Sequence, residues 1–417
     1  MNPLTHERWL SDHLIPALAS EDQSFLRRIA TDYELTFEEV RHLAKVARDL
    51  EMWRETSLAA WWEEAEVELA GDCIARKTAL LERLDKYHER LLWSEKTYPT
   101  VPLRGLTRGK AVLVERPAPT KVFGLCPFFT KEANCCGLYT IDAASGCALG
   151  CSFCAVSAFL GETVEFSTDL PQRLAEVELD PNRFYHVSTG QFTDSLVWGN
   201  RYGILDALFD FAHKHPNVQI ELKTKADRIN YLLKHEPPDN ILCTWLLNSE
   251  ILIRNEEHAT ASLRRRLQAA RTVADHGYRI GFHINPLVYF NGWRAEYASL
   301  AGHLLADFSP GELEFVGLGV ISFTSPVVRE IRKRGGESKV LQMPLVEDPK
   351  GKLTYPKERR VELYSTLYKA LQPWHGKVFF FLCMETSPVW EIVLGKTVPV
   401  APELQRLFNA RQLTSAA

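Results

Sequence analysis

From Leu138 onward, short apolar runs alternate with stretches of helical periodicity, and this alternation most constrains what the chain can fold into. Seven runs predict strands, at residues 139–144, 184–188, 218–224, 241–247, 278–285, 314–321 and 379–384. Helical patterns such as residues 203–213 and 262–276 lie between them. Such alternation is typical of parallel βα units, so we expect an α/β fold with a partial, open parallel β/α barrel. In barrels of this kind the chemistry lies at the C-terminal ends of the strands.

The rest of the chain divides by composition. Residues 1–96 read as a helical N-terminal domain, in which Thr36-Phe37-Glu38-Glu39 is a capping box that starts a helix. Residues 97–137 are rich in proline and glycine, so regular structure is interrupted there and we read them as a linker and lead-in. Residues 138–395 hold the predicted barrel, and residues 396–417 form a C-terminal tail.

Charge and hydropathy limit the possible partners. The formal net charge of −4 gives no global basic field for nucleic acid. Lysines and arginines nevertheless gather in residues 329–360, so DNA, if it binds, would meet this basic segment, although an ordinary exposed surface also fits. No run of about 18 apolar residues predicts a membrane span, and residues 1–11 do not resemble a secretory signal. We therefore expect a cytoplasmic protein without a membrane partner.

Clustered cysteines in a reducing compartment are more often metal ligands or reactive thiols than disulfides. Cys147, Cys151 and Cys154 have the spacing C-x3-C-x2-C on a loop that follows the first predicted strand. Three thiolates on one short loop can bind three irons of a [4Fe–4S] cluster and leave the fourth iron open to a small molecule. Structural zinc sites usually have four ligands, and no nearby histidine supplies the fourth. Zinc binding and incidental free thiols are the alternatives.

With Phe153 before its last cysteine, this motif resembles the signature of radical S-adenosylmethionine (radical SAM) enzymes. Further segments resemble the spore photoproduct lyase family, over roughly residues 138–390: they are residues 188–195, 221–225, 244–248, 277–286 and 383–385. The resemblance implies that a reduced cluster gives one electron to S-adenosylmethionine, and that the resulting 5′-deoxyadenosyl radical takes a hydrogen atom from a substrate. In spore photoproduct lyase that substrate is a thymine dimer of damaged DNA. An external electron donor, such as flavodoxin or ferredoxin, is implied as well.

The resemblance also suggests which residues hold the cofactor. Gly190 lies where the family holds the amino group of the cofactor's methionine, and Gln191 could add a polar contact. Lys225 matches a lysine that pairs with the methionine carboxylate. An ordinary strand-to-helix turn and a surface lysine are the alternatives.

Two further positions are assigned in the same way. Asn248 matches a polar position near the cofactor's ribose. His283 and Asn285 alternate on a predicted strand and so face the same side, where they could contact adenine or substrate. A satisfied core histidine is the alternative for His283.

Three positions depart from the lyase pattern. Gln191 stands where the lyase has the cysteine that returns a hydrogen atom to the product radical. Ala155 replaces a tyrosine, and Leu246 replaces a serine. We therefore expect retained cofactor chemistry with a changed substrate reaction, and leave the catalytic residues unassigned. A peptide or small-molecule substrate, or a DNA-binding protein with a structural cluster, are the alternatives.

Five other cysteines need separate interpretation. Cys126, Cys135 and Cys136 precede the motif and could ligate a second cluster with a fourth ligand from elsewhere, or could be idle thiols. Cys243 and Cys383 lie in predicted strands, where either could donate a hydrogen atom or serve as a small buried side chain.

Overall fold

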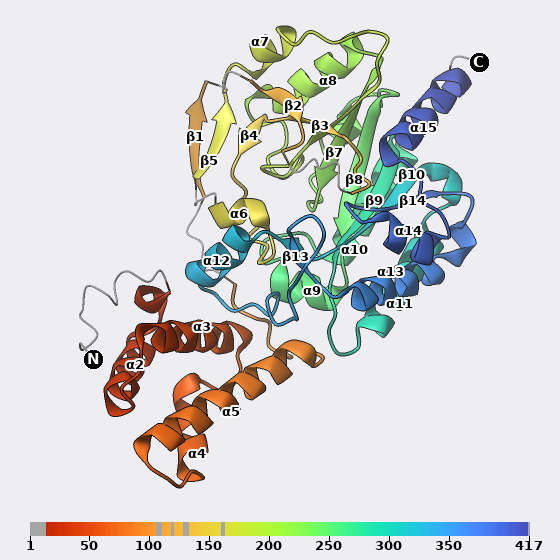
Figure 1. The fold of residues 1–417 in the computed structure, drawn as a ribbon. Coiled ribbons are helices and arrows are strands. Elements are labelled where there is room, and N and C mark those ends of the chain that lie inside the picture. Colours follow the sequence, from red (N-terminus) through yellow and green to blue (C-terminus); the bar gives the residue numbers. More distant parts are fainter. Residues whose placement is uncertain (1–13, 106–110, 118–120, 128–132, 160–162, 416–417) are drawn as a thin grey trace.

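The computed structural model describes residues 14–105, 111–117, 121–127, 133–159 and 163–415. Its N-terminal part is helical and lies to one side of the strands (Figure 1). These elements are η1 (Ile15–Ala17), α2 (Ser20–Asp32), α3 (Phe37–Trp53), α4 (Leu58–Val67) and α5 (Cys73–Trp93). They enclose a hydrophobic cluster of their own, built around fully buried side chains such as Leu43, Leu50 and Trp62.

Helix α3 begins at the predicted capping box, which is confirmed. The Thr36 hydroxyl accepts a hydrogen bond from the Glu39 amide at 3.3 Å, and the Glu39 carboxylate accepts one from the Thr36 amide at 2.6 Å. Two amides that the first helical turn leaves unpaired are thereby satisfied.

A buried ion pair joins these helices to the rest of the chain. Asp49 of α3 is fully buried, and its carboxylate accepts two hydrogen bonds from Arg332 of α12 (Ser325–Arg334) at 2.7 and 3.0 Å. The Arg48 side chain donates to the Arg332 carbonyl at 2.8 Å. The contact combines opposite charges with hydrogen bonds, as a buried ion pair requires.

An eight-stranded sheet forms the centre of the molecule, in the order β14-β10-β9-β8-β7-β6-β3-β2. All neighbouring pairs are parallel except β2 with β3. The strands are β2 (Phe123–Leu125), β3 (Tyr139–Ile141), β6 (Tyr185–Thr189), β7 (Val218–Thr224), β8 (Ile241–Leu247), β9 (Arg279–Leu287), β10 (Leu313–Val320) and β14 (Phe379–Leu382). The predicted α/β fold with parallel strands is confirmed.

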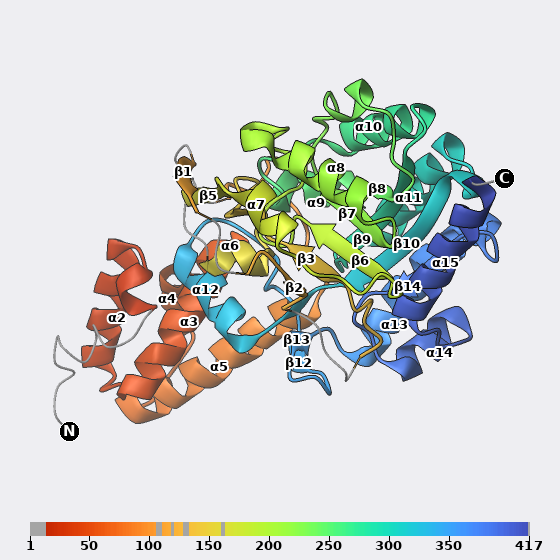
Figure 2. The ribbon, with the colours of Figure 1, turned by 90° about the horizontal axis from the view of Figure 1, so that it is seen from above.

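Helices connect the parallel strands and cover the sheet, with α8, α10 and α11 together on one side of it (Figure 2). Between strands lie α7 (Leu170–Ala175), α8 (Ile204–Lys214), α9 (Glu250–Glu256), α10 (Leu263–Asp275), α11 (Trp293–Asp307) and α13 (Lys357–Ala370). After the last strand, β14, come α14 (Ser387–Leu394) and α15 (Val400–Ser415). Across the described ranges, no helix combines the length and the apolar character needed to cross a membrane.

Two small sheets flank the main one. The first has the order β1-β5-β4, from β1 (Val112–Arg116), β5 (Thr163–Ser167) and β4 (Ala144–Ser145). The second has the order β11-β13-β12, from β11 (Ser322–Phe323), β13 (Leu353–Thr354) and β12 (Val346–Glu347). The short helix α6 (Ala155–Phe159) directly follows the cysteine motif.

The structure corrects the first predicted strand. Residues 139–144 do not form one strand, because β3 ends at Ile141 and the chain then joins the first small sheet through β4. Two strands that the sequence did not predict, β1 and β2, lie within residues 97–137. Residues 396–417, expected as a tail, contain the whole of helix α15 (Val400–Ser415).

The two ends of the main sheet are tied together although they do not pair as strands. Asn134, between β2 and β3, forms an isolated antiparallel bridge with Glu385, just after β14. The Asn134 amide donates to the Glu385 carbonyl at 3.2 Å. Segments from both ends of the sheet can therefore contribute side chains to one cavity.

Candidate active site

The loop that carries the C-x3-C-x2-C motif is held by backbone hydrogen bonds to the last residue of α9 and the segment that follows it. Cys151 forms a β-bridge with Glu257, the Ser152 amide donates to the Glu256 carbonyl at 2.8 Å, and the Ala259 amide donates to the Leu149 carbonyl at 3.0 Å. The loop starts at Gly146, whose φ of +102° suits glycine. A Cβ there would lie 2.3 Å from the Thr163 carbonyl oxygen, so a larger residue would displace the loop.

The three cysteines of the motif line a cavity of about 410 Å³. None of the nine cysteines, all of which lie in the described residues, forms a disulfide. Burial raises the pKa of the Cys147 thiol, and raises that of Cys151 to about 12. A metal ion binds the thiolate form of cysteine, and its positive charge compensates the negative charge of the thiolate. Metal binding would therefore release the protons of these buried thiols.

The geometry of the cysteines bears on the kind of metal centre. Within the described residues, no three His, Cys, Asp or Glu side chains form a group that could hold a metal ion. A cubane cluster binds each thiolate to a different iron, so its ligands need not converge on one point. Three thiolates in this cavity fit three irons of a cubane cluster, whereas a structural zinc ion usually takes four ligands.

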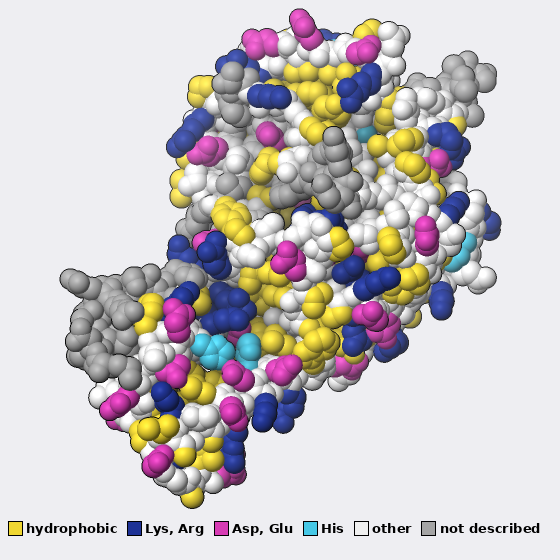
Figure 3. Space-filling view, in the orientation of Figure 1, with side chains coloured by type: hydrophobic (Ala, Val, Ile, Leu, Met, Phe, Trp, Pro, Cys, Tyr) yellow, Lys and Arg dark blue, Asp and Glu magenta, His cyan; other side chains and the backbone are white. Residues whose placement is uncertain are grey.

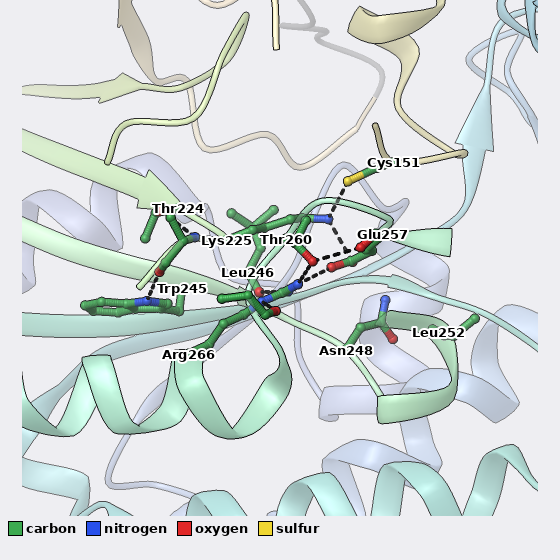
Figure 4. Close-up of polar contacts among 12 residues, drawn as sticks. Cys151, Thr224, Lys225, Trp245, Leu246, Asn248, Leu252, Glu257, Thr260 and Arg266 are labelled. Carbon is green, nitrogen blue, oxygen red and sulfur yellow. Dashed lines mark hydrogen bonds and ion pairs between the residues drawn. The ribbon is translucent and has the colours of Figure 1, made fainter. Parts of the chain in front are cut away.

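Lys225 lies beside this loop, just after β7. Its ammonium group donates to the Cys151 sulfur at 3.6 Å and to the Glu257 carboxylate at 2.8 Å (Figure 4). It also lies 4.6 Å from the centre of the Phe153 ring. Burial alone would lower the pKa of Lys225, but Cys151 and Glu257 together raise it. A cation therefore lies beside the loop that carries the cysteine motif, where it can attract an anionic group.

The Lys225 contact belongs to a buried network. The Arg266 guanidinium pairs with the second Glu257 oxygen at 2.5 Å and donates to the Leu246 carbonyl at 2.8 Å. Both side chains of that pair are fully buried. Burial would raise the pKa of Glu257, but Arg266 and Lys225 hold it at about 2. The network positions Lys225 and was not predicted, because Glu257 and Arg266 lie outside any recognisable motif.

Gly190 and Gln191 both line the cavity, after β6. Gly190 has φ of +86°, and a Cβ there would lie 2.8 Å from the Ser195 hydroxyl and 2.9 Å from the Lys223 carbonyl oxygen. The turn therefore requires glycine. Asp194 fixes the same turn, since its carboxylate accepts from the Lys225 amide at 2.7 Å.

Asn248 is the predicted residue that the structure does not bring to the cavity. It is fully buried, and its amide nitrogen donates to the Pro286 carbonyl at 2.9 Å. Its side-chain oxygen accepts from the Ser249 amide at 3.0 Å. In Figure 4 it stands apart from the Lys225 network. Its bonds join β8 to the end of β9, so in this structure its amide serves the fold.

His283 and Asn285 both line the cavity, as the alternation on the predicted strand requires. His283 forms a hydrogen bond of 2.7 Å between its Nε2 atom and the Glu221 carboxylate. His186 approaches the other Glu221 oxygen at 3.1 Å, and Lys223 lies 3.6 Å from it. Burial lowers the pKa of His283, while Lys223 and His283 hold that of Glu221 well below its usual range despite burial. These side chains form a polar wall that sequence reasoning only partly anticipated.

The positions that differ from the lyase pattern also face this space. Gln191, Ala155 and Leu246 all line the cavity. The differences are therefore located where they can change how a substrate fits and reacts.

A DNA-binding surface needs exposed basic side chains, and only some of those in residues 329–360 are exposed. Lys350, Lys352 and Arg360 line the cavity, and Arg332 is committed to Asp49. On the face shown in Figure 3, Lys and Arg side chains are interspersed with acidic and hydrophobic ones. The segment thus supplies charge to the cavity more clearly than to a continuous surface strip.

Comparison with known proteins identifies the family. The family model of spore photoproduct lyase matches residues 127–373, more than half of the chain. The chain belongs to the spore photoproduct lyase family. Curated lyases from Clostridium acetobutylicum and Geobacillus sp. are each 26% identical, over 42% and 48% of this chain. These matches cover 54% and 62% of the relatives, so the chain spans little more than half of their length.

Solved lyase structures share the fold. One, complexed with dinucleoside spore photoproduct, has a TM-score of 0.56 at 21% identity and covers 66% of this chain and 83% of its own. A second, with bound AdoMet and dinucleoside spore photoproduct, has a TM-score of 0.52 at 22% identity and covers 65% of this chain and 82% of its own. At this identity the likeness shows the fold alone.

Proposed function

We propose that this chain is a radical SAM enzyme, which cleaves S-adenosylmethionine reductively at a [4Fe–4S] cluster bound by Cys147, Cys151 and Cys154. The observation that carries the proposal is that all three motif cysteines line one cavity together with Gly190 and Lys225. The cluster would supply one electron and an open iron for the cofactor. An external flavodoxin or ferredoxin would reduce it, in a cytoplasmic setting.

The chain's own residues would hold the cofactor's methionine end. The Gly190 turn allows close backbone approach because it has no Cβ. The Lys225 ammonium, fixed by Glu257, offers a cation to a carboxylate. His283 and Gln191 remain candidates for contacts farther along the cavity. We infer that the parallel sheet forms the partial, open barrel that surrounds them, with residues 1–96 as a separate helical domain.

We further infer that the substrate is anionic, a nucleotide or nucleic acid. Lys350 and Lys352 line the cavity, and Lys350 is paired with Asp348 at 3.0 Å. Lys352 contacts the Met384 sulfur at 3.9 Å, and burial together with Lys350 lowers its pKa. A phosphate in the cavity would place negative charge beside Lys352 and favour its protonated form. Gln191 has no S–H to donate, so the substrate reaction would differ from that of the lyase.

The cofactor chemistry is tested by anaerobic reconstitution followed by an assay for 5′-deoxyadenosine after addition of dithionite and S-adenosylmethionine. The full chain should form it, and Cys151→Ala should reduce formation below detection. Cys73→Ala is the matched control, because Cys73 is exposed on α5. Bound iron without any 5′-deoxyadenosine would favour a DNA-binding protein with a structural cluster.

The substrate class is tested by fluorescence anisotropy with a labelled thymidine dinucleotide and duplex DNA at rising salt. If Lys352 contacts a phosphate, Lys352→Ala should weaken binding. It should also lower the slope of log K against log salt concentration by about 1. Salt-independent binding, or no binding, would count against an anionic substrate and favour a peptide or neutral small molecule. Salt-dependent binding that is unchanged in the variant would show that Lys352 does not contact the phosphate.

A further inference from the structure

Four cysteines outside the cluster loop line the same cavity. Cys126 follows β2, Cys135 and Cys136 precede β3, and Cys383 follows β14. The sequence suggested that the first three could act together, but it separates Cys383 from them by more than half the chain. Their meeting is a property of the fold.

Backbone contacts explain how the four thiols come together. The Cys126 amide donates to the Leu138 carbonyl at 3.0 Å, which brings Cys126 beside the end of the Cys135–Cys136 segment. The bridge between Asn134 and Glu385 brings the same segment beside the Cys383 loop. The two ends of the sheet therefore deliver thiols to one place.

The loop that carries Cys383 is held firmly. The Cys383 amide donates to the Leu318 carbonyl at 2.7 Å, and Glu385 pairs with Arg360 at 3.1 Å. Met384 between them has φ of 54°, a left-handed conformation that is uncommon for a residue other than glycine. Asn134 is held by a further contact, since its side-chain oxygen accepts a hydrogen bond from the Val400 amide at 3.2 Å.

A cation lines the cavity with these cysteines. Lys223 lies there and pairs with the Glu221 carboxylate at 3.6 Å. Lys223 is in β7 and Lys225 lies just after it, and both side chains line the cavity. Lys225 contacts Cys151 of the motif, and Lys223 is a second lysine in the same cavity.

We propose that Cys126, Cys135, Cys136 and Cys383 ligate a second iron–sulfur cluster in this cavity. Four sulfur ligands suit zinc or an iron–sulfur cluster. The four thiols line a cavity of about 410 Å³, where each could bind a different iron of a cubane cluster. The existence of the second cluster does not depend on cofactor cleavage.

The test is iron and sulfide content of the anaerobically reconstituted full chain and three variants. The unaltered chain should hold about eight irons, and the triple variant Cys147→Ala/Cys151→Ala/Cys154→Ala should retain about four. The quadruple variant Cys126→Ala/Cys135→Ala/Cys136→Ala/Cys383→Ala should also retain about four. Cys73→Ala, the exposed control, should keep the full content.

Iron content of about four in the unaltered chain and none in the triple variant would overturn the proposal, as would zinc in place of iron. The triple variant leaves all four proposed ligands intact, so the test does not depend on the folding of the quadruple variant. Loss of 5′-deoxyadenosine formation with about eight irons retained would instead count against the proposed function alone.

Discussion

At the scale of single residues, Gly190 shows how a site position can be fixed by sterics. Its positive φ, and the close approach that a Cβ would make to the Ser195 hydroxyl and the Lys223 carbonyl, leave no room for a side chain. Gly190→Ala should therefore displace the turn and destabilise the fold by about 1–3 kcal/mol. Thermal unfolding should show this loss of stability. A separate binding measurement should show weaker binding of S-adenosylmethionine. Gly302→Ala is the control, since a Cβ on Gly302 meets no atom within 4 Å; equal behaviour of the two variants would contradict the role.

Glu257 holds two buried cations, and its removal would leave both without their partner. Glu257→Gln should lower the free energy of unfolding by about 3–5 kcal/mol, because Lys225 and Arg266 would stay buried and uncompensated. Denaturant unfolding of the cluster-free protein measures the effect. The matched control is Glu63→Gln, whose pair with Arg28 is exposed and should contribute less than about 1 kcal/mol. Similar losses in both variants would refute the network's role.

At the scale of elements, the capping box of α3 gives a prediction with a known magnitude. Thr36→Ala removes the side-chain acceptor for the Glu39 amide and should cost about 1 kcal/mol. Thr36→Ser should restore most of the stability, because serine keeps the hydroxyl. Unfolding curves that place the alanine and serine variants together would show that the cap does not stabilise α3.

The elements also show what sequence could and could not predict. The bounds of β7 and β8 were predicted to the residue. β7 alternates apolar and polar residues, and β8 is an almost continuous apolar run, so each has a clear strand pattern. β3 was predicted too long, since local pattern does not reveal that the chain changes sheets after Ile141. β1 and β2 were missed because proline and glycine mask short edge strands.

Some residues of the candidate site could be predicted from the sequence and others could not. That Cys147, Cys151 and Cys154 lie together in one cavity was predictable, because their spacing is local. Glu257 and Cys383 were not, because their roles depend on contacts between distant segments. Asn248 fitted a family position, yet its amide is taken up by backbone partners.

At the scale of the whole molecule, Asp49 connects the N-terminal helices to the α/β part. Asp49→Ala leaves Arg332 without its buried partner and should destabilise the protein by about 3–5 kcal/mol. Asp32→Ala, at the exposed end of α2, is the control. Limited proteolysis should release the helical part more readily from the Asp49 variant; an unchanged cleavage pattern and stability would mean that the ion pair does not hold the two parts together.

The central claim is that the Cys147–Cys154 loop holds a cluster with one iron open to S-adenosylmethionine. Electron paramagnetic resonance of the dithionite-reduced quadruple variant, which lacks Cys126, Cys135, Cys136 and Cys383, isolates that cluster. We predict a cluster signal whose g values change when S-adenosylmethionine is added, because the cofactor would bind the open iron. A signal that the cofactor leaves unchanged, or no cluster signal at all, would contradict the account.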